Sequence, residues 1–270
     1  MIYETIQGDD VPALGFGTYK ITGVACREAV AHALEIGYRH IDTAQMYNNE
    51  REVGQGLDDA AVDRDDVFLT TKIWHSNLHP SDVRRTTEAS LRKLGTDYVD
   101  LLLIHWPNDA VPLEATLDAM LALREAGKTR HIGVSNFTPS LVRQALDHAP
   151  IFANQVEYHP FLSQNELLDL AREHDFMLTA YQPIARGTVA DDETLQAIAA
   201  AHGKSPVQVT LRWLLQQDKV TAIPKAASAE HREANFDVFD FELSADEMKR
   251  IHSLARGERR VNPGIAPAWE

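Results

Sequence analysis

Residues 99–106 read VDLLLIHW, and this stretch decides the fold class. Val99 to Ile104 form a mainly apolar run instead of an alternation of apolar and polar side chains. A strand that is covered by helices on both faces has such a run, because neither face meets water. The run therefore predicts a buried parallel strand, and parallel strands are joined by crossover connections that are usually helices.

Similar short apolar segments recur along the chain at intervals of about 25 to 35 residues, separated by longer amphipathic segments. We expect eight strands, at Leu14–Gly17, His40–Thr43, Val67–Lys72, Val99–His105, His131–Ser135, Ala153–Glu157, Met177–Tyr181 and Val220–Pro224. We expect their helices at Val24–Gly37, Glu50–Ala60, Pro80–Leu94, Pro112–Glu125, Pro139–Asp147, Gln164–His174, Asp191–Ala201 and Ala229–Phe236. The α/β alternation predicts a closed (β/α)8 TIM barrel, which usually takes roughly 250 residues. We expect one domain, spanning residues 1–270.

An open, doubly wound sheet is the alternative fold, but it needs a glycine-rich turn after its first strand. The sequence at that point, GFGTYKITG, contains G-x-G without a third glycine three residues later. The segments IYETI, GDD and VPAL near the N-terminus predict a β-hairpin that could plug the bottom of the barrel. Extra helices are expected at Pro206–Gln217 and Ser244–Ala255.

Composition limits the class of protein. The net charge of −14 argues against a nucleic-acid partner, since acidic surfaces repel phosphate backbones. A single cysteine, Cys26, forms no internal disulfide and suits a reducing compartment. We find neither a signal peptide nor a membrane span in the sequence, and expect a cytoplasmic protein without a membrane partner. The acidity fits a solubility charge, or adaptation to salt, since only eight of the 26 basic residues are lysines.

Four polar residues stand at or just beyond the predicted strand ends, where barrel enzymes place their active sites: Asp42, Tyr47, Lys72 and His105. Together they suit the reduction of a carbonyl group, whose oxygen must receive a proton. A lysine ammonium near Tyr47 would lower the pKa of that phenol from its usual value near ~10. Asp42 would keep Lys72 charged, and His105 could orient the carbonyl oxygen.

Two other classes of function remain open at this stage. His40, Asp42, His105 and His159 could hold zinc in a metal-dependent hydrolase, although Lys72 would then lie among the ligands. A barrel that binds a nicotinamide cofactor but turns over little could serve as a redox sensor. The intact Asp-Tyr-Lys-His set argues against lost catalysis.

Six motifs resemble the aldo-keto reductase superfamily, and the resemblance covers about residues 10 to 270. They are GFGTYK (15–20), GYRHIDTAQMYNNEREVG (37–54), LTTKIW (69–74), LGTDYVDLLLIHWP (94–107), GKTRHIGVSNF (127–137) and NQVEYHP (154–160). Within this family the chain is most similar to prokaryotic 2,5-diketo-D-gluconate and methylglyoxal reductases, and the short tail RRVNPGIAPAWE (259–270) supports that branch.

The resemblance implies reduction of small aldehydes, 2-oxoaldehydes and keto-sugars by NADPH, without a metal and as a monomer. By motif, Asp42, Tyr47, Lys72 and His105 match the catalytic set, with Tyr47 as the proton donor. Tyr181 matches the family residue that stacks on the nicotinamide ring. The residues that match those forming hydrogen bonds to its carboxamide are Ser135, Asn136 and Gln155. The remaining cofactor candidates are Gly17, Thr18, Gln182, Pro183, Ile184, Ile223, Lys225, Ser228, His231 and Asn235.

The part of the sequence that would bind the adenine end of the cofactor departs from the family pattern. In IPKAASAEHREAN (223–235), the serine, arginine and glutamate positions hold Ala226, His231 and Ala234. Arg232 is one residue from the arginine position and should point about 100° away around a helix. Because arginine suits a 2′-phosphate best, its loss weakens the case for strict use of NADPH. Lys225 and Ser228 remain, so NADPH is still the expected cofactor and NADH a possible second one.

The substrate pocket is expected to be lined by Tyr19, Trp74, His105 and Trp106, with Met46 and Asn108 as further candidates. Aromatic walls suit small or flat carbonyl compounds. The short C-terminal tail should close this pocket little.

Overall fold

The computed structural model describes residues 1–269, and its main sheet has eight parallel strands. In order around the sheet they are β3 (Phe16–Gly17), β4 (His40–Asp42), β5 (Phe68–Ile73), β6 (Val99–Ile104), β7 (Thr129–Ser135), β8 (Ala153–Glu157), β9 (Met177–Tyr181) and β10 (Val220–Ala222). The eight predicted strands are therefore confirmed, with ends that move by a few residues.

Hydrogen bonds between the first and last strands close the sheet. Leu14 forms a parallel bridge with Ala222, and Gly15 N donates to Ala222 O over 2.8 Å. Gly17 N donates to the carbonyl oxygen of Pro224 over 3.1 Å. A side chain at Gly17 would not fit, because a Cβ there would lie 2.7 Å from the carbonyl oxygen of Ile223. The predicted barrel is thus confirmed. Its closure requires a residue without a side chain at position 17, where the first and last strands meet.

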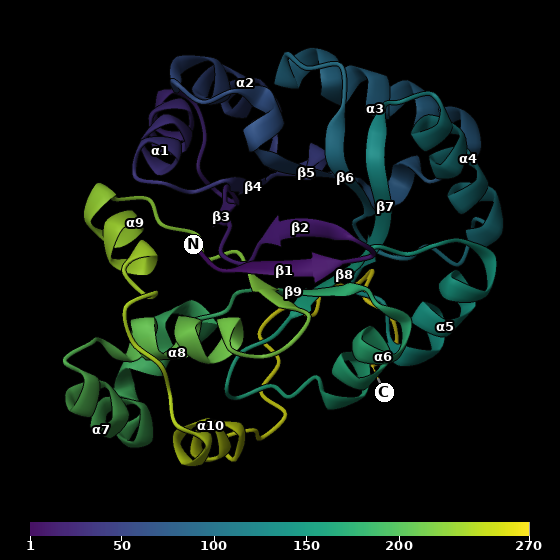
Figure 1. The fold of residues 1–270 in the computed structure, drawn as a ribbon. Helices are drawn as coiled ribbons and strands as arrows, with labels where there is room; N and C mark the ends of the chain where they lie inside the picture. Colours follow the sequence, from purple (N-terminus) through teal and green to yellow (C-terminus); the bar gives the residue numbers. More distant parts are fainter. Residues whose placement is uncertain (270) are drawn as a thin grey trace.

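Helices surround the sheet (Figure 1). They are α1 (Val24–Glu35), α2 (Glu50–Asp59), α3 (Pro80–Leu94), α4 (Leu113–Glu125), α5 (Pro139–His148), α6 (Asn165–His174), α7 (Glu193–His202), α8 (Pro206–Leu215), α9 (Ala229–Phe236) and α10 (Ala245–His252). Short 3-10 turns lie at η1 (Gln45–Tyr47), η2 (Arg64–Asp66), η3 (His75–Asn77) and η4 (Ala185–Asp191). None of the helices in the described part of the chain is long and apolar enough to cross a bilayer.

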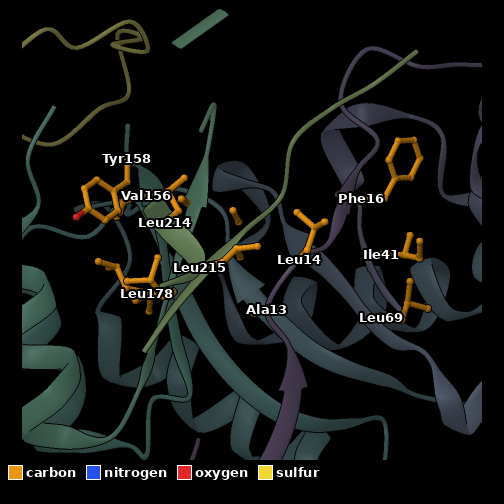
Figure 2. Close-up of a cluster of buried hydrophobic side chains, with 14 of the residues drawn as sticks. Ala13, Leu14, Phe16, Ile41, Leu69, Val156, Tyr158, Leu178, Leu214 and Leu215 are labelled. Carbon is orange, nitrogen blue, oxygen red and sulfur yellow. The ribbon is translucent and has the colours of Figure 1, made fainter. Parts of the chain in front are cut away.

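The outer core fills the space between the sheet and the helices. Phe16, Ile41 and Leu69 are register partners on three neighbouring strands, and Figure 2 shows them in one row. All three are fully buried, as expected of a sheet that meets helices on its outer side.

The N-terminal hairpin plugs one end of the barrel. It consists of β1 (Tyr3–Ile6) and β2 (Asp9–Pro12), and it lies across the opening in Figure 1. Ile6 and Val11 are fully buried in an inner cluster with Leu101, Leu103 and Phe152, among others. Gln7 donates to Ile151 O, just before β8, so the hairpin covers the amino-terminal ends of the strands. The predicted plug is confirmed, and the opposite end remains for the polar cluster.

Candidate active site

The four polar residues singled out from the sequence come together at the carboxyl ends of the strands. Asp42 ends β4, Lys72 lies in β5, and His105 follows β6 directly. Tyr47 ends η1, a turn that follows β4 and is closed by Asn48 in the left-handed conformation (φ 55°). Asparagine tolerates this conformation well, so it is a suitable residue to turn the chain there.

Lys72 is the centre of this cluster, and its side chain is fully buried. Its Nζ donates to Asp42 Oδ1 (2.6 Å), to the carbonyl oxygen of Thr43 (2.9 Å) and to Tyr47 Oη (3.3 Å). Burial lowers the pKa of Lys72, and the Asp42 carboxylate opposes that change. The ammonium is thus held by two oxygens and aimed at the phenol of Tyr47.

The prediction that the Lys72 ammonium lowers the pKa of Tyr47 is wrong. Burial raises the pKa of Tyr47 well above its ordinary value, and electrostatic interactions with Asp42, Tyr181 and Tyr19 act in the same direction. Removal of water around the hydroxyl therefore outweighs the nearby ammonium. Tyr47 carries its proton at neutral pH, which is the form a proton donor requires.

His105 is the second group that faces Tyr47. Their rings meet edge to face, with centroids 5.7 Å apart, and the Trp74 ring also packs against His105, with centroids 5.3 Å apart. Burial, followed by the charge of Lys72, lowers the pKa of His105 well below its ordinary value. The imidazole is therefore neutral, and can offer or accept one hydrogen bond without adding charge.

Asn49 anchors the loop that carries Tyr47, a role that the sequence analysis missed. Its Nδ2 donates to the carbonyl oxygens of Thr18 (2.9 Å) and Ile21 (2.8 Å), and its Oδ1 accepts from Thr43 Oγ1 (2.7 Å). Asn49 is fully buried, so these bonds satisfy polar groups that water does not reach. Its place in the YNNE motif was the available signal.

The predicted carboxamide-binding residues form a second cluster beside the first. Tyr181 Oη donates to Asn136 Oδ1 (2.7 Å), and Asn136 Nδ2 donates to His105 O (2.9 Å). Ser135 Oγ donates to Gln155 O (2.9 Å). Ser135, Asn136 and Gln155 are buried, whereas Tyr181 is partly exposed. The ring of Tyr181 is thus fixed by its hydroxyl and suits stacking with a planar group.

Gln155 joins the two clusters. Its Nε2 donates to Asp42 Oδ2 over 2.8 Å, while Asp42 Oδ1 receives the bond from Lys72. Both oxygens of the Asp42 carboxylate are thus fixed. Gln155 therefore positions Asp42, a contact that the sequence did not reveal.

The residues expected to bind the adenine end of the cofactor lie after β10 and in α9. Lys225, Ser228 and His231 are exposed, and Asn235 is buried. Ser228 caps α9, since its Oγ accepts from His231 N (3.3 Å). The amino-terminal end of a helix beside a lysine suits an anion such as a phosphate. The residues present therefore fit the phosphate end of a dinucleotide.

Arg232 points elsewhere, as expected. Its Nη1 donates to the carbonyl oxygens of Ala226 (3.2 Å) and Ala227 (2.8 Å), and its Nε lies 3.2 Å from His32 Nδ1. The guanidinium holds the backbone before α9 in place. It does not replace the arginine that is absent at His231.

The remaining cofactor candidates lie around the same rim. Thr18 is buried and its Oγ1 donates to the carbonyl oxygen of Asp42, and Gly17 and Ile223 meet at the barrel seam. Gln182, Pro183 and Ile184 connect β9 to η4, with Gln182 in the left-handed conformation (φ 52°).

Two of the three predicted aromatic pocket residues contact the polar cluster. Tyr19 is 39% exposed and packs against Tyr47, and Trp74 packs against His105. Met46 is partly exposed, next to Tyr47 in the sequence. Asn108 fixes its own loop, because its Nδ2 donates to His75 O (3.0 Å) and its Oδ1 accepts from Ala110 N (3.0 Å).

The C-terminal tail covers more of the site than expected. Trp106 is only 4% exposed, and Trp269 packs edge-on against it with ring centroids 6.2 Å apart. The expectation that the short tail leaves this side open is therefore wrong, since its last aromatic returns to the end of β6. Trp269 was not predicted from the sequence, although a tryptophan in a short tail was the available signal.

Two histidines of the hydrolase alternative, His40 and His159, do not join His105 in this cluster. His40 Nδ1 lies 3.2 Å from the carbonyl oxygen of Pro12, and its ring packs against Phe68. His159 Nε2 lies 3.1 Å from Glu157 Oε1. Within residues 1–269, no three histidine, cysteine, aspartate or glutamate side chains come close enough to share a metal ion. The geometry does not favour a metal-dependent hydrolase.

Comparison with known proteins gives one consistent answer. The chain is 40% identical to methylglyoxal reductase DkgB of Salmonella typhi over 268 residues, which is 96% of this chain and 99% of that relative. It is 41% identical to glyoxal reductase of Bacillus subtilis (strain 168) over 256 residues, 94% of this chain and 92% of that relative.

Solved structures agree. The crystal structure of a putative 2,5-diketo-D-gluconic acid reductase B superposes with a TM-score of 0.97 at 44% identity, covering 99% of this chain and 97% of the other. A Bombyx mori aldo-keto reductase in complex with NADP superposes with a TM-score of 0.90 at 32% identity, covering 97% and 95%. The sequence profile of the Aldo/keto reductase family matches residues 13–256, and the chain belongs to that family.

Proposed function

We propose that this protein reduces aldehydes and ketones with a nicotinamide cofactor, preferably NADPH, and that Tyr47 donates the proton. The observation that carries the proposal is the position of Lys72 Nζ, which lies 2.6 Å from Asp42 and 3.3 Å from Tyr47 Oη. A buried ammonium next to a protonated phenol favours transfer of the phenolic proton, because it stabilises the tyrosinate that forms.

The bound cofactor would supply the hydride for the carbonyl carbon. Tyr47 would donate its proton to the carbonyl oxygen as negative charge develops there. Lys72 would stabilise the anion left on Tyr47, while Asp42 and Gln155 hold Lys72 in place. His105 is neutral and would orient the carbonyl oxygen through a hydrogen bond.

Tyr181, with Ser135, Asn136 and Gln155, would hold the nicotinamide ring and its carboxamide. Lys225, Ser228 and the start of α9 would hold phosphate groups, with Asn235 nearby. His231, in place of an arginine, would weaken recognition of a 2′-phosphate, so we propose that NADH also serves as a cofactor.

Small carbonyl compounds are the proposed substrates. Relatives of this chain are named methylglyoxal and glyoxal reductases, and a structural relative is described as a 2,5-diketo-D-gluconic acid reductase. The aromatic residues Tyr19, Trp74 and Trp106 suit methylglyoxal, other 2-oxoaldehydes and keto-sugars. We further propose that residues 1–270 act as one domain, as a cytoplasmic monomer.

The first test measures the initial rate at which NADPH, or NADH, loses its absorbance when methylglyoxal is the substrate. Oxidation of NADPH supports the reductase, and the ratio of the two rates measures the effect of His231. If neither cofactor is oxidised with methylglyoxal or with a panel of keto-sugars, but NADPH binds tightly, the redox-sensor alternative is favoured.

A further inference from the structure

The C-terminal tail is fastened to the barrel through its backbone. Arg256 N and Glu258 N both donate to the carbonyl oxygen of Phe161, over 3.2 and 3.0 Å. Arg260 N and Val261 N donate to the two carboxylate oxygens of Glu157, each over 2.8 Å. Glu157 ends β8 and is fully buried, so residues 256–261 are held firmly at the rim of the barrel.

Three arginines lie in this fastened segment, and two of them share one carboxylate partner. Arg256 and Arg260 both form ion pairs with Glu258, and Arg260 also donates to Thr188 Oγ1. Arg259 differs from its neighbours. Within residues 1–269 its guanidinium forms neither an ion pair nor a side-chain hydrogen bond, and its Nη1 is shielded from solvent without a partner.

The guanidinium of Arg259 lies over the ring of Trp269, with its central carbon 3.6 Å from the ring centroid. Trp269 in turn packs against Trp106, the residue after His105. Burial lowers the pKa of Arg259, and its interactions with Tyr181 and with the Glu157 carboxylate oppose that change. Arg259 therefore lies on the rim between the ends of β6 and β9, beside residues proposed to contact the substrate and the nicotinamide.

A guanidinium N–H that is shielded from water and unpaired is costly, and the cost disappears when an anion binds it. The protein is strongly acidic, with a net charge of −14, so an anionic substrate needs a local positive charge to bind. Lys225 and the start of α9 are on the adenine side. Arg259 is the cation that the tail brings to the substrate side.

We infer that Arg259 binds a carboxylate on the substrate and makes the enzyme prefer carbonyl compounds that carry one. This inference rests on the proposed reductase function and adds to it a residue that selects substrate by charge. Arg259 lies beside Trp269 and Trp106, so it would contact the end of the substrate remote from the reacting carbonyl.

The test uses two aldehydes that differ mainly in charge, 4-carboxybenzaldehyde and its methyl ester, methyl 4-formylbenzoate. kcat/KM is measured for both with NADPH, in the wild type and in Arg259→Gln, Arg259→Lys and Arg256→Gln. Arg256 is the matched control, because it lies in the same fastened segment but covers Phe161, with its central carbon 4.0 Å from that ring centroid.

Arg259→Gln should lower kcat/KM for the carboxylate by about 10- to 100-fold, the effect of one hydrogen bond to a charged group, mainly through KM. In the same variant, kcat/KM for the ester should change by less than about twofold, as is usual for a substitution at the protein surface. Arg259→Lys should keep most of the preference, and Arg256→Gln should behave as the wild type.

Equal losses for the acid and the ester would overturn the inference, because they would mean that Arg259 only supports the tail. A loss that follows weaker NADPH binding, measured by quenching of tryptophan fluorescence, would assign Arg259 to the cofactor and overturn it as well. Wild-type reduction of the ester tests the proposed function separately. If the ester is reduced but Arg259→Gln leaves the acid unaffected, the reductase stands and the inference fails.

Discussion

Lys72 Nζ lies 2.6 Å from Asp42 Oδ1, and neither side chain is more than 2% exposed. Removing two charges from water is costly, and a buried ion pair often stabilises a fold no better than apolar residues of similar size. We propose that the Asp42–Lys72 pair serves the reaction, because it keeps an ammonium beside the phenol of Tyr47. The pair therefore connects the stability of the barrel to the reaction that we propose.

Breaking this pair should cost stability and activity in separable ways. Asp42→Asn should lower the free energy of unfolding by about 3–5 kcal/mol, because it leaves a buried ammonium without its partner. The double change Asp42→Leu with Lys72→Met should recover most of that loss and remain inactive. Urea unfolding of the single variants Asp42→Leu and Lys72→Met and of the double variant measures the coupling between the two residues. A double variant that is no more stable than either single variant would contradict this account.

Tyr47→Phe should reduce turnover by about 100- to 10,000-fold, since it removes the proposed proton donor. Cofactor affinity should stay unchanged, and fluorescence titration with NADPH measures it. Tyr19→Phe is the matched control, because the Tyr19 ring packs against Tyr47 with centroids 5.0 Å apart. Turnover of Tyr47→Phe close to the wild-type value would refute the assignment.

The pH profile should reflect a neutral His105. Because burial lowers the pKa of His105 well below its ordinary value, its charge does not change as pH falls through about 6.5. Because the pKa of Tyr47 is raised, the donor stays protonated into the alkaline range. The value of kcat/KM for reduction should therefore have no acidic limb near 6.5, and should fall only on the alkaline side. An acidic limb near 6.5 that disappears in His105→Asn would contradict this reading.

His231→Arg should shift cofactor choice toward NADPH. His231 is exposed in the first turn of α9, three residues after the cap Ser228, where an arginine can reach a phosphate. We expect the ratio of NADPH to NADH affinity to rise about tenfold, the effect of one charge-assisted hydrogen bond. His231→Lys tests whether charge alone is enough. An unchanged ratio in both variants would place the 2′-phosphate elsewhere.

Stability should decrease in acid because of His40. Burial lowers the pKa of His40 below its ordinary value of 6.5, so the folded protein holds the neutral ring. The stability it contributes is full above pH 6.5 and is lost as pH falls from there toward the folded-state pKa, at up to about 1.4 kcal/mol per pH unit. Urea unfolding between pH 7 and 5 should show a smaller slope in His40→Gln. The exposed His79→Gln serves as the control, and equal slopes in the wild type and His40→Gln would contradict the prediction.

The fold was predictable because its strands have distinct apolar runs. The predicted strands Ala153–Glu157 and Met177–Tyr181 have those bounds in the structure, and the predicted strand Val99–His105 ends one residue earlier, at Ile104. The first strand is shorter than expected, Phe16–Gly17, because Gly15 and Gly17 fit against His40 and Ile223 where regular pairing gives way to a seam. Such contacts depend on residues far apart in the sequence.

The members of the proposed site were predictable, but their interactions were not. Motif spacing brought Asp42, Tyr47, Lys72 and His105 together. The pKa of Tyr47, in contrast, depends on its burial in the folded site and on electrostatic interactions with the groups around it. The bond from Gln155 to Asp42 crosses the barrel, and no local pattern announces it. The tail 256–269 has no periodicity, so the return of Trp269 to Trp106 was not visible before folding.

The seam between Leu14 and Ala222 has a consequence for biosynthesis. A barrel closed by its first and last strands cannot be completed on the ribosome until β10 has emerged, when most of the chain already exists. Long-range pairing of this kind slows folding and leaves strand edges exposed meanwhile. The incomplete sheet, in which β3 has an unpaired edge, is then the state most prone to aggregation. Chaperones that shield such edges should raise the yield of active enzyme.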